Sequence, residues 1–156
     1  MKNIKKLDNT DINILTELYA NSRITNKELS SKANIVPSTC LERVKKLQSS
    51  GVIKGFSLNI DYQALGGNIE AMTTIRLGKH SSQVIQRFKD DLILSPEVLN
   101  IFYMGGEDDF LLHIIVKDTE HLRNFISSKI TSRDEVVHIE TALIYEQLSC
   151  NKLPIL

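Results

Sequence analysis

Three acidic residues follow two glycines in the segment from Gly105 to Asp109, which lies between two apolar stretches. Closely spaced backbone N–H groups at glycines can bind a carboxylate, and a carboxylate such as that of Asp109 can bind an ammonium group. Together these groups would suit an α-amino acid. The same residues are also typical of a plain β-turn, in which glycines adopt positive φ and acidic side chains stay solvated. The spacing alone leaves both interpretations open.

An acid–base pair made of Asp108 and Asp109 is a third interpretation, and it would imply an enzyme. Adjacent residues at a strand end tend to point to opposite faces, so neighbouring carboxylates do not readily converge on one atom. The sequence also contains no nucleophile–base motif and no phosphate-binding loop. We therefore predict that the protein is not an enzyme.

A second group of polar residues recurs along one face of a predicted helix that begins at Pro37 and ends near Ser50. Four apolar residues share the sector that would pack on the rest of the domain: Cys40, Leu41, Val44 and Leu47. The opposite face begins with hydroxyls and a carboxylate and continues with cations, which suits base edges first and phosphates further on. The predicted DNA contacts are Ser38, Thr39, Glu42, Arg43 on the flank, Lys45, Lys46 and Ser49, with Lys54 from the next segment. A merely solvated amphipathic helix shows a similar face.

Capping signals place two helices before this one. Asp8 with Asp11, and Thr25 with Glu28, both match the capping box that starts a helix. Asn34 suits the tight turn that follows the second helix, because asparagine tolerates left-handed backbone geometry. Three helices in this order, with a tight turn between the second and the third, predict a helix-turn-helix that reads DNA.

The segment after Gly51 changes character. Gly51 suits the left-handed end of the third helix. Residues 52–60 combine Val, Ile and Phe with small breakers, which predicts a strand-like arm of a winged helix-turn-helix. The predicted organisation is therefore a DNA-binding domain over 1–60, a linker over 61–67 and a second domain over 68–156.

The second domain alternates strands with helices. Strands are predicted over 69–77, 98–104, 110–116 and 137–145, and helices are predicted to start at Ser81 or Ser82 and at Asp118 or Thr119. The order βαββαβ predicts an α+β, ferredoxin-like sandwich with both helices on one face of the sheet. The uncovered face keeps apolar residues, which predicts a homodimer formed sheet to sheet.

Charge is unevenly distributed although the 156 residues carry a formal net charge of zero. Residues 1–60 hold ten Lys/Arg against five Asp/Glu, whereas residues 61–156 hold nine against fourteen. Only the first half is therefore suited to a polyanion. No apolar run reaches the roughly 18 residues of a membrane span, and the N-terminus shows no signal-peptide core, so we expect a cytoplasmic protein without a membrane partner. The cysteines and histidines lack metal-ligand spacing, which predicts no metal and no cofactor.

Four motifs carry a resemblance to a known family. They are Leu7-Asp8-x-x-Asp11-x-x-Ile14-Leu15, Arg23-Ile24-Thr25-x-x-Glu28-Leu29-Ser30, the run Cys40-Leu41-Glu42-Arg43-Val44-Lys45-Lys46-Leu47, and Gly51-Val52-Ile53-x-Gly55. With them, and through the second half, the chain resembles the Lrp/AsnC family of leucine- and asparagine-responsive bacterial transcription regulators. The resemblance implies a sequence-specific regulator of double-stranded DNA that forms a dimer, often an octamer, and binds a small amino acid between dimers. The effector-binding residues it implies are Gly105, Gly106, Glu107, Asp108, Asp109, Ala142, Leu143 and Ile144.

Three positions depart from the family pattern. Val36 replaces the serine that usually caps the DNA-reading helix, and Gly105 stands where a hydroxyl residue is frequent. The family's signature in this segment is Gly-x-aromatic-Asp-aromatic, and Asp108 stands at the position of its first aromatic residue. An extra carboxylate beside the effector would favour a cationic or polar amino acid over leucine. The alternative function is a DNA-compacting architectural protein that needs no effector, with weak sequence preference and a steep salt dependence.

Overall fold

The computed structural model describes residues 7–150 and 152–154, which form two compact units. One unit extends to Asn59 and includes the segment from Leu148, and the other covers Ile60–Gln147. The predicted linker over 61–67 thus falls within the second unit, and the segment from Leu148, predicted in the second domain, groups with the first. The predicted outer limits at residues 1 and 156 lie outside the described residues. None of the helices in the described ranges has the length and apolarity that crossing a membrane requires.

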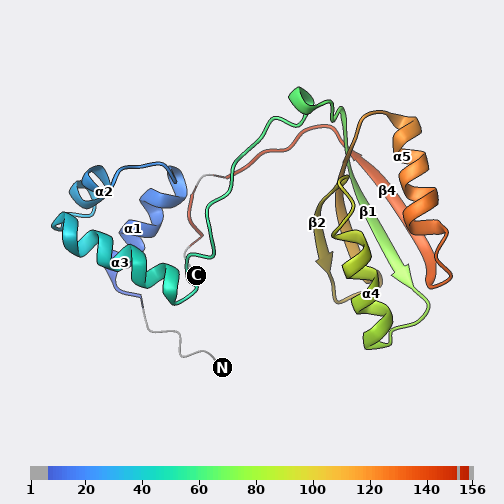
Figure 1. The fold of residues 1–156 in the computed structure, drawn as a ribbon, viewed down its shortest axis with the longest axis horizontal. Coiled ribbons are helices and arrows are strands. Elements are labelled where there is room, and N and C mark those ends of the chain that lie inside the picture. Colours follow the sequence, from blue (N-terminus) through green and yellow to red (C-terminus); the bar gives the residue numbers. More distant parts are fainter. Residues whose placement is uncertain (1–6, 151, 155–156) are drawn as a thin grey trace. The chain divides into compact units, whose positions relative to one another are not determined.

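The first unit is a bundle of three helices: α1 (Asn9–Ala20), α2 (Asn26–Lys32) and α3 (Pro37–Ser49) (Figure 1). Its buried core consists of Ile14, Leu29, Ala33, Cys40 and Leu47. Because Cys40 is fully buried, desolvation raises the pKa of its thiol, which acts as a small apolar side chain.

The predicted helix boundaries of the first unit are confirmed by their caps. Asp8 and Thr25 each form a complete capping box, with Asp11 and Glu28 as the respective partners. Asn34 adopts φ 53° in the turn before α3, and Gly51 adopts φ 79° after it. These local signals need only neighbouring residues, which is why the sequence reveals them.

Two expectations about the first unit were wrong. The segment 52–60 forms no strand, because no other described segment of the chain pairs with it and an isolated strand leaves its backbone groups unpaired. Leu41, assigned to the packed face of α3, is 46% exposed. It lies at the edge of that sector, one residue and about 100° away from the fully buried Cys40.

The second unit is a four-stranded antiparallel sheet covered by helices on one face, as predicted (Figure 1). After a short 3₁₀ helix, η1 (Gln63–Leu65), the elements are β1 (Ile69–Leu77), α4 (Ser82–Leu92), β2 (Val98–Tyr103), β3 (Phe110–Val116), α5 (Thr119–Phe125), η2 (Ile126–Thr131) and β4 (Val136–Ile144). The strand order is β2-β3-β1-β4. One buried cluster forms the core of this unit. In it, alternate residues of β1 and β3 pack with Phe88 and Leu92 of α4, Phe125 of α5 and Ile130 of η2.

Two irregularities were not predicted. The register between β1 and β4 shifts at Arg76 and Leu77, so that Val136 packs against the core while Val137 is 60% exposed. The second helix changes from α-helix to π-helix at Ile126. A π-helix needs hydrogen bonds from residue i+5, a spacing that apolar periodicity does not reveal.

The face of the sheet opposite the helices holds both apolar and polar side chains. Met72 and Ile115 are half-buried there. His113 is buried, and its Nε2 atom makes no hydrogen bond to any described residue but lies 3.9 Å from a carboxylate oxygen of Glu70. The predicted sheet-to-sheet dimer would cover this face, and it stays a prediction.

Candidate DNA-binding surface and effector hairpin

The face of α3 turned away from the core carries most of the predicted DNA contacts. Ser38, Glu42, Lys45, Lys46 and Ser49 are exposed, and Thr39 is half-buried. The start of α3 is anchored to α2, because the Asn26 side-chain amide donates to the carbonyl oxygen of Pro37 at 2.9 Å. Val36, the N-cap residue, makes no side-chain bond to the helix, as its lack of a hydroxyl predicts. The exposed polar face is thus carried on a rigidly packed helix, and its contacts with DNA stay a prediction.

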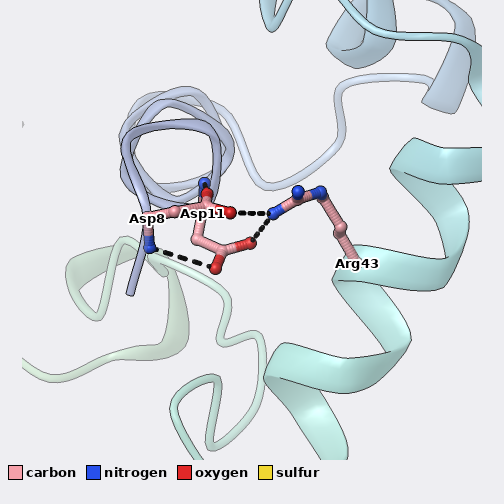
Figure 2. A network of polar contacts seen from close by, with 3 residues as sticks. All are labelled: Asp8, Asp11 and Arg43. Carbon is pink, nitrogen blue, oxygen red and sulfur yellow. Dashed lines mark hydrogen bonds and ion pairs between the residues drawn. The ribbon is translucent and has the colours of Figure 1, made fainter. Parts of the chain in front are cut away.

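Arg43 differs from these residues because its guanidinium is engaged within the unit. Arg43 Nη1 lies 2.7 Å from Asp8 Oδ2 and 2.7 Å from Asp11 Oδ1, so that α3 is tied to the start of α1 (Figure 2). The same two carboxylates form the capping box of α1. Arg43 is therefore placed to hold α3 in position, a role that the helical wheel of α3 does not show.

This ion-pair cluster predicts a specific acid sensitivity of the first unit. Hydrogen bonding from Arg43 lowers the pKa of Asp8, so the native state prefers the ionised carboxylate. The resulting stabilisation is complete above the ordinary aspartate pKa of about 4 and is lost as pH falls through the lower native pKa. We expect the urea midpoint of the wild type to fall more between pH 5 and pH 3 than that of Asp8→Asn, which keeps a capping side chain.

Glu42→Gln is the control for this measurement, because it removes a carboxylate from the same unit at an exposed position. Its pH dependence should follow the wild type. Equal losses in wild type and Asp8→Asn would show that the cluster adds nothing to acid stability.

Two exposed apolar residues accompany the polar face and were missed as candidate contacts. Leu41 lies three residues after Ser38 and four before Lys45, so these side chains neighbour one another on the helix surface. Val36 precedes the helix and is 61% exposed. Apolar side chains in a major groove can contact thymine methyl groups. The helical periodicity assigned Leu41 to the packed face, so no signal in the sequence indicated that this side chain is exposed beside the polar face.

Residues 104–109, which we call the effector hairpin, join β2 to β3 and leave several backbone N–H donors free. The N–H of Met104 donates to the carbonyl of Asp109, and the N–H of Asp109 donates to that of Ile75 on β1. Within the described residues, the N–H groups of 105–108 have no acceptor. Gly106 adopts φ 148°, a conformation that favours glycine. The loop therefore presents free amide donors, and their binding of a carboxylate stays a prediction.

Asp109 is held in place rather than free. Its Oδ2 accepts the N–H of Leu77 at 2.7 Å, its Oδ1 lies 2.9 Å from His80 Nε2, and its side chain is only 14% exposed. A carboxylate offers about four lone-pair sites, so capacity for an ammonium group remains. Asp108 points elsewhere, toward Arg76. The divergence of the two aspartates matches the argument against an acid–base pair.

Arg76, which sequence analysis did not single out, pairs with the other two acids of the hairpin. Its Nη2 atom lies 2.7 Å from Glu107 Oε1 and 3.2 Å from Asp108 Oδ1. Burial acts to lower the pKa of Arg76, but the ion pairs with Glu107 and Asp108 outweigh it, and the net shift is upward. Arg76 therefore stays charged beside the hairpin.

The remaining predicted effector residues lie elsewhere on the sheet. Ala142, Leu143 and Ile144 pair with Met72, Ala71 and Glu70 of β1, whereas the hairpin contacts Ile75 and Leu77. Met72 and Ile75 alone are separated by about 10 Å of strand. One chain therefore does not bring the two groups together.

An open cleft of about 370 Å³ lies where α5 and η2 meet Thr141 of β4, and residues 142–144 are not part of its lining. It is lined by Thr119, Leu122, Arg123, Ile126, Ser127, Thr131 and Thr141, so the π-helix η2 forms part of its wall. Among the described residues there is no cluster of three or more His, Cys, Asp or Glu side chains that could hold a metal ion.

Known families and structures match both units. Residues 7–54 match the family described as winged helix-turn-helix DNA-binding, and residues 70–154 match the Lrp/AsnC ligand binding domain. The HTH-type transcriptional regulator AldR of Mycolicibacterium smegmatis is 37% identical over 92% of this chain and 84% of its own length. Transcriptional regulator AzlB of Bacillus subtilis is 33% identical over 88% of each chain. A transcriptional regulator of Neisseria meningitidis, crystallised as a complex with L-Met, superposes with a TM-score of 0.86 at 27% identity, covering 96% of this chain and 97% of its own.

Proposed function

The chain belongs to the Lrp/AsnC family of transcription regulators, and on this premise we propose that it binds specific DNA sites as an oligomer and responds to a small amino acid. The observation that carries the proposal is the exposed polar face of α3, which two capping boxes and the Arg43 cluster hold on the bundle. DNA reading needs a helix presented in this way to the major groove.

The proposed effector is an α-amino acid bound at the hairpin. The unpaired N–H groups of 105–108 suit its carboxylate, and Asp109 suits its ammonium group. The crystallised L-Met complex of the related Neisseria protein supports this choice. Because the 142–144 segment lies far from the hairpin within one chain, a second copy would supply it, which fits assembly of dimers into a larger oligomer such as an octamer.

The proposed mechanism links assembly to DNA binding. Two α3 helices of a two-fold dimer would enter successive major grooves of a roughly palindromic site. An amino acid bound where chains meet would change how many dimers associate, and hence how many DNA sites are held at once. Avidity would then change without any new contact to a base.

The proposal predicts strong discrimination between DNA sequences. We expect DNA selected from a random library by the full chain to bind at least roughly 10³-fold more tightly than a scrambled sequence at equal salt. Fluorescence anisotropy measures both affinities, and analytical ultracentrifugation with and without L-methionine or L-leucine measures assembly.

The architectural alternative predicts the opposite outcome. A DNA-compacting protein would bind selected and scrambled DNA almost equally, with a steep salt dependence and no response to any amino acid. Such a result would refute sequence-specific regulation.

A further inference from the structure

The hairpin carries three carboxylates, and each of them already has a partner within the second unit. Glu107 and Asp108 share the Nη2 atom of Arg76, while Asp109 is bound by a backbone N–H and by His80. Arg76 reaches the hairpin because it lies on β1 one residue before Leu77, whose N–H fixes Asp109. The buried Nε atom of Arg76 makes no hydrogen bond within the described part of the chain, and the Nη2 atom is directed at the hairpin acids Glu107 and Asp108.

We propose that Arg76 sets the class of effector, so that the hairpin accepts amino acids with uncharged side chains and rejects cationic ones such as lysine and ornithine. This inference rests on the proposed amino-acid site. From the sequence alone, Asp108 counts as a free negative charge and favours a cationic effector. In the structure its carboxylate already faces a fixed cation.

The physical reason is like-charge repulsion at short range. An ammonium group of a ligand side chain that approached Asp108 would also approach the Arg76 guanidinium, which lies 3.2 Å from that carboxylate. Like charges within about 4–6 Å disfavour each other strongly. The α-ammonium group of any amino acid escapes this penalty, because Asp109 is paired with His80 and Leu77 and not with Arg76.

The test compares ligand selectivity in the wild type and in Arg76→Met, which keeps an unbranched side chain but removes the charge. Isothermal titration calorimetry of the full chain uses L-methionine, L-leucine, L-lysine and L-ornithine. We expect the wild type to bind the two uncharged amino acids at least about tenfold more tightly than the cationic pair. Arg76→Met should shift this ratio toward lysine by about tenfold or more, and Arg76→Met/Asp108→Asn should reverse the shift.

Two further variants separate charge from structural damage. Asp108→Asn leaves Arg76 with Glu107 alone, so L-glutamate binding should improve relative to L-methionine, even if the Arg76 variants fold poorly. Arg87→Met removes a cation from the exposed side of α4, where the guanidinium faces Asp91 at 4.0 Å. It should keep the wild-type selectivity.

The outcomes distinguish this inference from the proposed function. Binding of uncharged amino acids with an unchanged ratio in Arg76→Met, or wild-type preference for lysine, overturns the role of Arg76 and leaves the amino-acid site intact. Absence of binding by every amino acid of the panel overturns both.

Discussion

Replacing Asp109 by asparagine should cost the protein its amino-acid response and part of the stability of its second unit. The carboxylate accepts the N–H of Leu77 and lies beside His80 in a side chain that is 14% exposed. An amide offers one acceptor oxygen and no charge, so the charge-assisted bonds are lost. Such bonds contribute roughly 1.5–3 kcal/mol each, and we expect the urea unfolding free energy to fall by about that amount.

Asp109→Asn should also weaken ligand binding strongly. The proposed ammonium partner disappears, and the hairpin that presents the N–H groups of 105–108 loses the charge-assisted one of its links to β1, while the N–H of Asp109 still donates to the carbonyl of Ile75. Loss of about 3 kcal/mol corresponds to a drop of roughly 100-fold in affinity for L-methionine, measured by calorimetry below the unfolding temperature. Asp134→Asn, the matched control, removes an exposed carboxylate from the same unit and should bind normally. Unaltered affinity in Asp109→Asn would exclude this residue from the effector site.

Removing both carboxylates that hold Arg43, in Asp8→Asn/Asp11→Asn, should weaken DNA binding. The two possible roles of Arg43 predict opposite changes in DNA affinity. If Arg43 reads DNA directly, the double variant frees its guanidinium and removes two negative charges, so affinity rises. If Arg43 positions α3 on α1, as the two 2.7 Å contacts indicate, affinity falls by roughly fivefold to tenfold.

Salt dependence separates this positioning effect from a phosphate contact. Arg43→Met should lower affinity equally for all sequences, reduce the urea midpoint of the first unit and leave the salt slope unchanged. Lys45→Met, on the exposed face of α3, should keep the midpoint and reduce the slope of log K against log salt by about one. Fluorescence anisotropy between low and moderate salt measures both. A rise in affinity of the double aspartate variant would assign Arg43 to the DNA interface.

The helices, the strands and the hairpin were largely predictable because their signals are local. Capping residues such as Asp8 and Thr25 act within one turn, and the alternation along β1 needs only the order of residues. Contacts between distant residues were not predictable. Arg43 meets Asp8 across 35 positions, and Arg76 meets Asp108 across 32, so their roles follow from packing that periodicity does not encode.

The failed expectations have the same origin. The segment 52–60 has strand composition, but a strand also needs a neighbour to complete its hydrogen bonds. The last strand was predicted as a regular alternation over 137–145, but the bulge opposite Arg76 and Leu77 interrupts that alternation, so that Val136 packs against the core and Val137 is exposed.

Because the hairpin and the 142–144 segment are separated, the response to ligand should depend on the concentration of the protein itself. A ligand that requires both groups has no complete site on a solitary chain, so ligand capture and self-association are one coupled equilibrium. By mass action, diluting the protein then has the same effect as withdrawing the ligand. The number of copies in a cell would set the ligand concentration at which the response begins.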